Sequence, residues 1–117
     1  MKYNNDFKYD LIVGHIGEKY LNKILTKKKI EVKTDLQAGA TGNIFIEYFS
    51  RGKKSGISTT ESDWYCFVIS NEKMILIETK ELKEICRSYV NSNRDIKGGD
   101  SNTSKGILLP IKDLFNA

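Results

Sequence analysis

The chain has 117 residues, which is enough for one domain with its own core and too few for two. Hydrophobic residues make up 39% and charged residues 29%, and no apolar run approaches the roughly 20 residues that a membrane-spanning helix needs. The first ten residues contain no apolar signal core, so we expect a cytoplasmic protein, or one in the host cytoplasm if the source is viral, with no membrane partner. A net charge of +4 and a pI of about 9.0 permit a polyanionic partner such as DNA but do not require one.

Residues 10–27 have the periodicity of an amphipathic helix, with Asp10 as its expected N-cap. The apolar stripe consists of Val13, Ile16, Gly17, Tyr20, Leu21, Ile24 and Leu25. Gly14 and Gly17 each cost about 1 kcal/mol in a helix interior relative to alanine, which suggests that this helix packs very close to a sheet. Glu18 lies at the margin of the stripe, where its carboxylate either reaches an acidic patch on that sheet or stays in water.

Residues 29–50 have the pattern of a β-hairpin. Over residues 30–35, Ile30, Val32 and Thr34 alternate with Glu31, Lys33 and Asp35. Over residues 44–49, Ile44, Ile46 and Tyr48 alternate with Phe45, Glu47 and Phe49, and alternation of this kind is typical of strands with two distinct faces. Gly39 and Gly42 lie between these segments and can adopt the positive φ that a tight reversal needs. The sequence therefore predicts two antiparallel strands joined by a short turn.

A three-residue loop would set the register of this hairpin so that Asp35 lies opposite Glu47 and Lys33 lies opposite Phe49. Opposed side chains have Cβ atoms about 5 Å apart, so two carboxylates placed there repel each other unless a cation lies between them. Carboxylate oxygens are the ligands that Mg²⁺ prefers, and Lys33 is about 7 Å from Asp35 along the strand. This patch has the groups that metal-assisted hydrolysis of a phosphodiester needs. The alternative is the solvated polar face of a two-stranded ribbon.

Two polar, glycine-bearing segments could contact a nucleic-acid backbone. The first, residues 51–56, follows the hairpin and is either a phosphate-contacting loop or a solvated turn. Its basic residues are Arg51, Lys53 and Lys54. The second, residues 91–106, is a long loop, and such loops in small domains are usually functional or disordered. Its Arg94 and Lys105 could contact phosphates.

A continuous apolar run over residues 64–70 predicts a buried central strand, and residues 74–78 predict the next strand. Thr79 is the expected N-cap of a second helix with an apolar stripe at helical spacing. The stripe consists of Leu82, Ile85, Cys86, Tyr89 and Val90. Another face of this helix carries Lys80, Lys83 and Arg87. That face is either exposed to solvent without a binding role or part of an anion-binding surface.

Residues 107–111 predict a last short strand before a terminal helical turn at residues 112–115. Pro110 places this strand at a sheet edge or marks the end of the strand. Cys66 and Cys86 lie in apolar segments without a CxxC pair or a nearby histidine, which disfavours zinc. We expect two buried free thiols, with a disulfide as the alternative.

The predicted order is helix, four strands, helix and strand. With one extra strand allowed, this order resembles, over most of the chain, the αβββαβ core of the PD-(D/E)XK nuclease superfamily. In that family a first-helix glutamate, an aspartate on one hairpin strand and an (E/Q)-x-K motif on the next strand form the site. The matching positions are Glu18, Asp35 and Glu47. The spacing of the last two is similar to that of archaeal Holliday-junction resolvases, and residues 42–69 resemble small phage-type nucleases of this superfamily.

One position departs from the family pattern, because Phe49 stands where the family has its lysine. In the predicted register Lys33 faces Phe49 across the ribbon, so its ammonium group could serve the same water from the neighbouring strand. Alternatively, Glu31 and Lys33 form the E-x-K motif and Asp10 supplies the aspartate, with an entire helix between them.

The sequence therefore predicts one α/β domain over residues 1–117, with a mixed central sheet of about four to five strands flanked by helices. The resemblance implies a Mg²⁺-dependent endonuclease, with Mn²⁺ as a substitute, that cuts DNA, including branched DNA, as a homodimer. Asp35, Glu47 and Glu18 would hold the metal, and Lys33 would assist catalysis. The residues expected to contact DNA are Arg51, Lys53, Lys54 and Lys105. The rival hypotheses are an inactive nuclease-fold module that binds DNA or a protein without metal, and an adaptor whose acidic patch is only surface.

Overall fold

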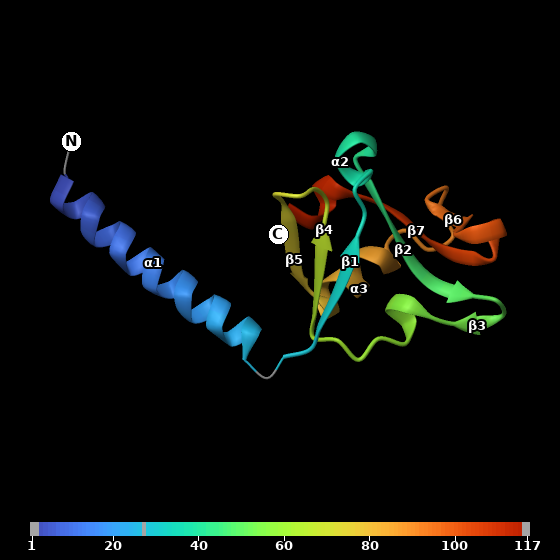
Figure 1. Ribbon diagram of the computed structural model, residues 1–117, viewed down its shortest axis with the longest axis horizontal. Coiled ribbons are helices and arrows are strands. Elements are labelled where there is room, and N and C mark those ends of the chain that lie inside the picture. The colour runs from blue at the N-terminus through green and yellow to red at the C-terminus, as the bar shows by residue number, and fades with distance from the viewer. Residues whose placement is uncertain (1–2, 27, 116–117) are drawn as a thin grey trace.

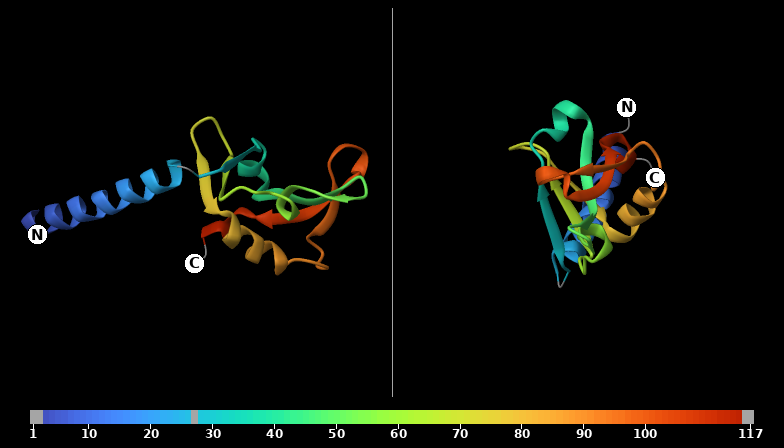
Figure 2. Two further views of the ribbon diagram at one scale, coloured as in Figure 1. Left: turned by 90° about the horizontal axis from the view of Figure 1, so that it is seen from below. Right: turned by 90° about the vertical axis from the view of Figure 1, so that its right-hand side faces the viewer.

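Helix α1 (Tyr3–Leu25) is the first element of the computed structural model, which describes residues 3–26 and 28–115. The helix points away from the rest of the chain, which folds into two sheets and a short helix (Figures 1 and 2). The helix predicted over residues 10–27 is confirmed in type but begins earlier, so Asp10 lies inside it and is not its N-cap. Position 27 lies outside the described residues.

Sheet A has the strand order β1-β4-β5. β1 (Ile30–Thr34) runs parallel to β4 (Trp64–Val68), which pairs antiparallel with β5 (Met74–Glu78). The apolar run in β4 fits its central place, because four successive side chains of this strand are buried. The predicted buried central strand is therefore confirmed.

Sheet B is antiparallel and has the order β3-β2-β7-β6. Its strands are β3 (Lys53–Lys54), β2 (Asn43–Ser50), β7 (Ser104–Pro110) and β6 (Asp95–Gly98). Pro110 is the last residue of β7, so the prediction that it marks the end of the strand is confirmed. β7 is an inner strand of sheet B, so the alternative prediction of an edge position is wrong. The long loop predicted over residues 91–106 is wrong in part, because it contains β6 and the start of β7. The fold is α/β as predicted, but the seven strands of the described residues divide between two sheets instead of forming one central sheet of four to five.

The predicted hairpin between residues 30–35 and 44–49 is wrong. Both segments are strands, but β1 pairs with β4 and β2 pairs with β7 and β3. Between them the chain forms the short helix α2 (Ala38–Thr41), which ends at Gly42 with φ of 74°. A helical turn separates the two strands, so they do not form a tight two-stranded ribbon.

The hydrophobic core lies between the two sheets and helix α3 (Thr79–Arg87). Leu82 and Cys86 of the predicted stripe are buried, but the helix ends at Arg87, so Tyr89 and the exposed Val90 lie beyond it. Thr79 is the first helical residue and Glu78 is the N-cap, so the predicted cap was one residue late. Cys66 and Cys86 are buried free thiols, as predicted. The remaining elements are the 3-10 turns η1 (Gly56–Ser58), η2 (Asp100–Asn102) and η3 (Ile111–Phe115), the last of which confirms the predicted terminal turn.

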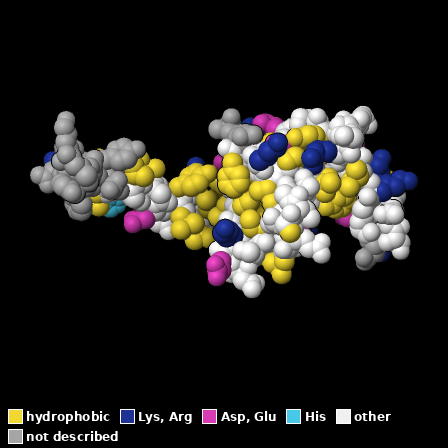
Figure 3. Space-filling model, turned by 90° about the horizontal axis from the view of Figure 1, so that it is seen from above, with side chains coloured by type: hydrophobic (Ala, Val, Ile, Leu, Met, Phe, Trp, Pro, Cys, Tyr) yellow, Lys and Arg dark blue, Asp and Glu magenta, His cyan; other side chains and the backbone are white. Residues whose placement is uncertain are grey.

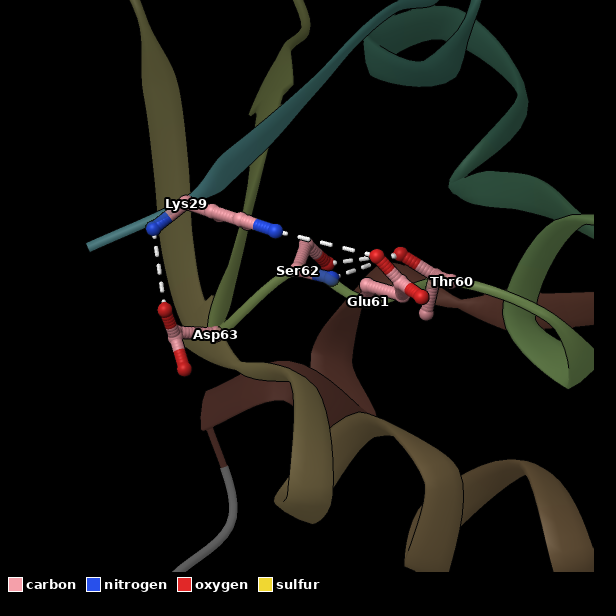
Figure 4. A network of polar contacts seen from close by, with 5 residues as sticks. All are labelled: Lys29, Thr60, Glu61, Ser62 and Asp63. Carbon is pink, nitrogen blue, oxygen red and sulfur yellow. Dashed lines mark hydrogen bonds and ion pairs between the residues drawn. The ribbon is translucent and has the colours of Figure 1, made fainter.

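The start of β1 is tied to the segment that precedes β4 (Figure 4). The backbone amide of Lys29 donates a 2.9 Å hydrogen bond to Oδ2 of Asp63, and its Nζ lies 3.7 Å from Oε2 of Glu61. Thr60 and Ser62 bond to each other in the same segment. These contacts fix where β1 begins, and therefore which of its side chains face sheet B.

Candidate active site between β1 and β2

Lys33, Asp35 and Glu47 line one pocket of about 230 Å³. β1, the residue that follows it and β2 provide its charged residues, and Tyr65 and Phe67 of β4 form part of its wall. Lys33 pairs with Phe67, whose side chain belongs to the core, so the register turns Lys33 toward sheet B. The structure thus brings together the three polar residues of the predicted patch although their strands are not paired.

Asp35 directly follows β1 and is held by hydrogen bonds to the backbone on both sides. Its amide donates a 2.9 Å hydrogen bond to the carbonyl of Val68, which extends the parallel ladder by one residue. Its Oδ1 accepts a 3.1 Å hydrogen bond from the amide of Gln37. This Asx-type turn starts the path into α2 and fixes the carboxylate beside the pocket.

Glu47 lies on β2, immediately before an irregularity in the pairing of β2 with β7. Its Oε2 accepts a 2.9 Å hydrogen bond from the hydroxyl of Ser55. Gly56 packs against the backbone of Glu47, since a Cβ at position 56 would lie 2.2 Å from its carbonyl oxygen. The turn η1 therefore supports the Glu47 carboxylate from the side of β3.

The irregularity places Tyr48 as an extra residue between the pairs that Glu47 and Phe49 make with β7. The Tyr48 hydroxyl donates a 2.6 Å hydrogen bond to Oδ1 of Asp95, which raises the pKa of Tyr48 to about 12 together with burial and the charge of Asp95. Burial disfavours the Asp95 carboxylate, but the hydrogen bonds from Tyr48 and the Asn91 amide and the nearby charge of Lys105 lower the pKa of Asp95 overall. This half-buried hydrogen bond links β6 to the bulged strand β2.

The structure does not bring Glu18 to the pocket. Glu18 lies on α1, and its side chain is 76% exposed. Its Oε2 lies 3.8 Å from Nδ1 of His15 on the same helix. Asp10 lies on the same helix, so the alternative motif built on Asp10, Glu31 and Lys33 finds no common site either.

The predicted pairing of Lys33 with Phe49 is also wrong, because Phe49 pairs with Lys54 and Lys105. The physical reason is that Phe49 lies in sheet B, whereas Lys33 belongs to sheet A. Lys33 nevertheless reaches the pocket that Glu47 lines.

Two carboxylates are the acidic ligands that this pocket offers, and within residues 3–26 and 28–115 no group of three His, Cys, Asp or Glu side chains could hold a metal ion. The single hydrogen bonds to Oδ1 of Asp35 and Oε2 of Glu47 leave one oxygen of each carboxylate for another ligand. Mg²⁺ commonly takes one or two carboxylates and completes its shell with water and substrate phosphate oxygens. The donor set therefore suits Mg²⁺ better than a metal that needs an all-protein cage.

Three exposed lysines form a row across sheet B, in register with Phe49. Lys54 pairs with Phe49, Phe49 with Lys105, and Lys105 with Lys97, so all four side chains share one face. Directly opposed like charges such as Lys97 and Lys105 repel each other. A bound polyanion would remove that cost. Lys97 escaped the sequence analysis because its strand lies in a segment without apolar alternation.

A second pocket, of about 310 Å³, adjoins this row. Its lining includes Lys54 of β3 and both Lys83 and Arg87 of α3, and it contains no carboxylate. Cys86 also lines it, and burial raises the pKa of this thiol to about 12, so the thiol stays neutral at ordinary pH. The cationic face predicted for the second helix thus joins the loop after β2 in one basic surface.

The other basic residues predicted to contact phosphates have two different roles. Arg51 and Lys53 are exposed at the β2–β3 turn, where Arg51 and Gly52 have φ of 50° and 82°. Arg94 instead donates 2.9 Å hydrogen bonds to Oδ1 of Asn43 and the carbonyl of Leu108. Arg94 therefore has a structural role, and its predicted phosphate contact is not supported.

None of the helices that the structure describes combines the length and the apolar character needed to cross a membrane. Comparison of the chain with protein-family models, curated proteins and solved structures finds no match.

Proposed function

We propose that this protein is a metal-dependent endonuclease that hydrolyses DNA phosphodiester bonds, with a site of the PD-(D/E)XK type. The observation that carries the proposal is the convergence of Lys33, Asp35 and Glu47 on one pocket. The two carboxylates could bind a divalent cation, and the ammonium group of the lysine could act on water or on a phosphate oxygen.

Each residue of the pocket has a distinct role in this proposal. Asp35 and Glu47 would hold Mg²⁺, which would offset the negative charge that develops on the phosphate. Lys33 would orient the attacking water and donate to a phosphate oxygen from the side of β1. Glu18 has no role in the site, because α1 keeps it away from the pocket.

The substrate is proposed to be DNA gripped through its backbone. The lysine row and the basic residues of the β2–β3 turn offer charge to phosphates, and backbone contacts carry no sequence information. We therefore expect recognition of DNA shape, including branched junctions, with little preference for base sequence.

The deciding experiment compares cleavage of duplex and four-way-junction DNA with Mg²⁺ by the wild type, Asp35→Asn and Glu47→Gln. The matched control is Glu72→Gln, which alters an exposed carboxylate in the β4–β5 turn. Each pocket variant should lose about 100-fold or more of the activity, and the control should retain it. Absence of cleavage by the wild type, or equal activity in all four proteins, would overturn the proposal.

A second candidate function is a nuclease-fold module that binds DNA or another protein without catalysis. It is favoured by Phe49 at the family's lysine position and by the two-carboxylate character of the pocket. A native-state metal site must raise the melting temperature when Mn²⁺ is added, so a shift in the wild type that Asp35→Asn abolishes supports the nuclease. DNA binding without any such shift supports the module.

A further inference from the structure

Helix α1 exposes an apolar stripe to solvent over most of its length. At 100° per residue, Val13, Ile16, Tyr20 and Leu21 lie on one side of the helix, and Ile12 and Leu25 lie at its margins. Ile16 is 62% exposed and Val13 is 46% exposed. A surface helix normally buries such a stripe, whereas most of this one is left uncovered by the part of the chain that the structure describes.

Sheet A has an apolar face of its own on the side away from the core. Val32, Cys66 and Leu76 are register partners across its three strands, so their side chains share one face. Tyr65 and Phe67 belong to the core cluster and therefore point to the other side. Val32 is 56% exposed and Met74, on the outer face with Leu76, is 63% exposed.

These two surfaces already meet at one point. The rings of Tyr20 on α1 and Trp64 on β4 are 5.7 Å apart and nearly perpendicular, and Ile24 is buried. Trp64 lies on the outer face of sheet A, two residues before Cys66. The stripe that contacts Trp64 therefore continues toward the N-terminus beyond the edge of the core.

The direction of α1 prevents it from covering the rest of its own sheet. Its 23 residues span about 34 Å, and the helix extends from the core along the long axis of the molecule (Figure 1). Figure 3 shows hydrophobic side chains gathered on the part of the core next to α1 as well as along the helix. Among the described residues, thirteen large hydrophobic side chains are exposed, and seven of these lie on α1 and three on the outer face of sheet A.

We propose that α1 of one copy of this chain packs on the outer face of sheet A of a second copy, in a reciprocal twofold dimer. A twofold axis lets the same helix stripe and sheet face bury each other twice, which closes the assembly. The Tyr20–Trp64 contact continues directly into this interface, because it joins the same two surfaces within each copy. A Cβ added at Gly14 or Gly17 would meet no atom of the described chain beyond the helix's own backbone within 4 Å, and the small size of these glycines would let the partner's strands approach the helix closely.

The first test is the mass of the full chain in solution, measured by light scattering over a wide concentration range. We expect a dimer with twice the 13.4 kDa of the chain. Ile16→Lys should give monomers, and Asn22→Lys, on the polar side of the same helix, should leave the dimer intact. Both changes insert a good helix former, so circular dichroism should report helix in both. A monomeric wild type, or equal masses for the two variants, would overturn the proposal.

The second test distinguishes packing of α1 on sheet A of a second copy from packing of α1 on sheet A of its own chain. In the double variant Ile16→Cys/Leu76→Cys, a bismaleimide should link the helix to the outer face of sheet A. A covalent dimer on a denaturing gel supports the proposal, and a link within one chain overturns it. Binding of the wild type to anionic lipid vesicles as a monomer would also overturn it, since the stripe would then serve a membrane surface. Dimer formation is independent of catalysis, so either proposal can fail without the other.

Discussion

The hydroxyl of Ser55 donates a 2.9 Å hydrogen bond to Oε2 of Glu47 across the β2–β3 hairpin. This bond connects the basic turn, which is proposed to grip DNA, to an acid that is proposed to hold the metal. A hydrogen bond to one carboxylate oxygen fixes the rotamer of the side chain and directs the other oxygen to the pocket. Ser55 is therefore a positioning residue for the proposed site.

Ser55→Ala should raise the Mg²⁺ concentration needed for half-maximal cleavage by about tenfold, because the Glu47 carboxylate loses its support. Cleavage rates measured over a Mg²⁺ titration give this value. Ser70→Ala, in the β4–β5 turn, is the control and should leave the titration unchanged. An unchanged midpoint in Ser55→Ala would show that Glu47 does not need this bond.

Lys33→Met should lower cleavage by about 100-fold at saturating Mg²⁺ and leave the Mn²⁺-induced rise in melting temperature intact. Lys33 lines the pocket from β1 but is not a metal ligand, so its loss should affect the reaction and not metal binding. Lys73→Met removes an exposed lysine elsewhere on the chain and should behave like the wild type. Loss of the Mn²⁺ shift together with the activity would assign Lys33 a structural role instead.

Lys97→Gln/Lys105→Gln should weaken DNA binding and reduce the slope of log K against log salt by about 2, because each lysine neutralises one phosphate. The same double variant should be slightly more stable without DNA, since the opposed charges on β6 and β7 no longer repel each other. Lys19→Gln/Lys73→Gln makes the same change in charge at two exposed lysines away from the row and from the basic surface of α3. Identical slopes for the two double variants would exclude the row as the DNA contact.

The sequence predicted those parts of the fold that depend on local interactions and missed those that depend on distant segments. Alternation placed β1 and β2 correctly, because the side-chain period of a strand is a property of its own sequence. The partner of a strand depends on distant segments, and the parallel pairing of β1 with β4 left no local signal. Gly42 does adopt a positive φ, but it ends a helical turn and not a hairpin.

The same reasoning applies to the site. Lys33 and Asp35 follow the pattern of one strand, and Glu47 that of another, so they could be identified as a group before their geometry was known. Glu18 belongs to a helix whose position depends on contacts that its own sequence does not specify. β6 was missed because Gly98 and its polar neighbours disfavour strands, and Asp95 secures that strand through a long-range bond to Tyr48.

Tyr48→Phe should destabilise the protein by about 1.5 kcal/mol at neutral pH, because Asp95 loses a hydrogen bond to its charged carboxylate. The hydrogen bond to Asp95 raises the pKa of Tyr48 from its ordinary value of 10 to about 12 in the folded state. The stabilisation is therefore complete below pH 10 and is lost as the pH rises through about 12. Denaturant unfolding between pH 8 and pH 12 should converge for the two proteins, and a constant difference in the free energy of unfolding would contradict the assignment.

Gly56→Ala should destabilise the protein by about 3 kcal/mol or more and also weaken the Mn²⁺-induced thermal shift. Gly56 has φ of 51°, and an added Cβ would lie 2.2 Å from the carbonyl oxygen of Glu47, so β2 must move at its acid. Gly52→Ala is the matched control, since Gly52 also has a positive φ but its Cβ would meet no atom within 4 Å. It should cost only about 1–2 kcal/mol and keep the full shift. Equal losses of stability in the two variants would mean that backbone strain alone acts at position 56. An unchanged Mn²⁺-induced thermal shift in Gly56→Ala would show that metal binding does not depend on the position of Glu47.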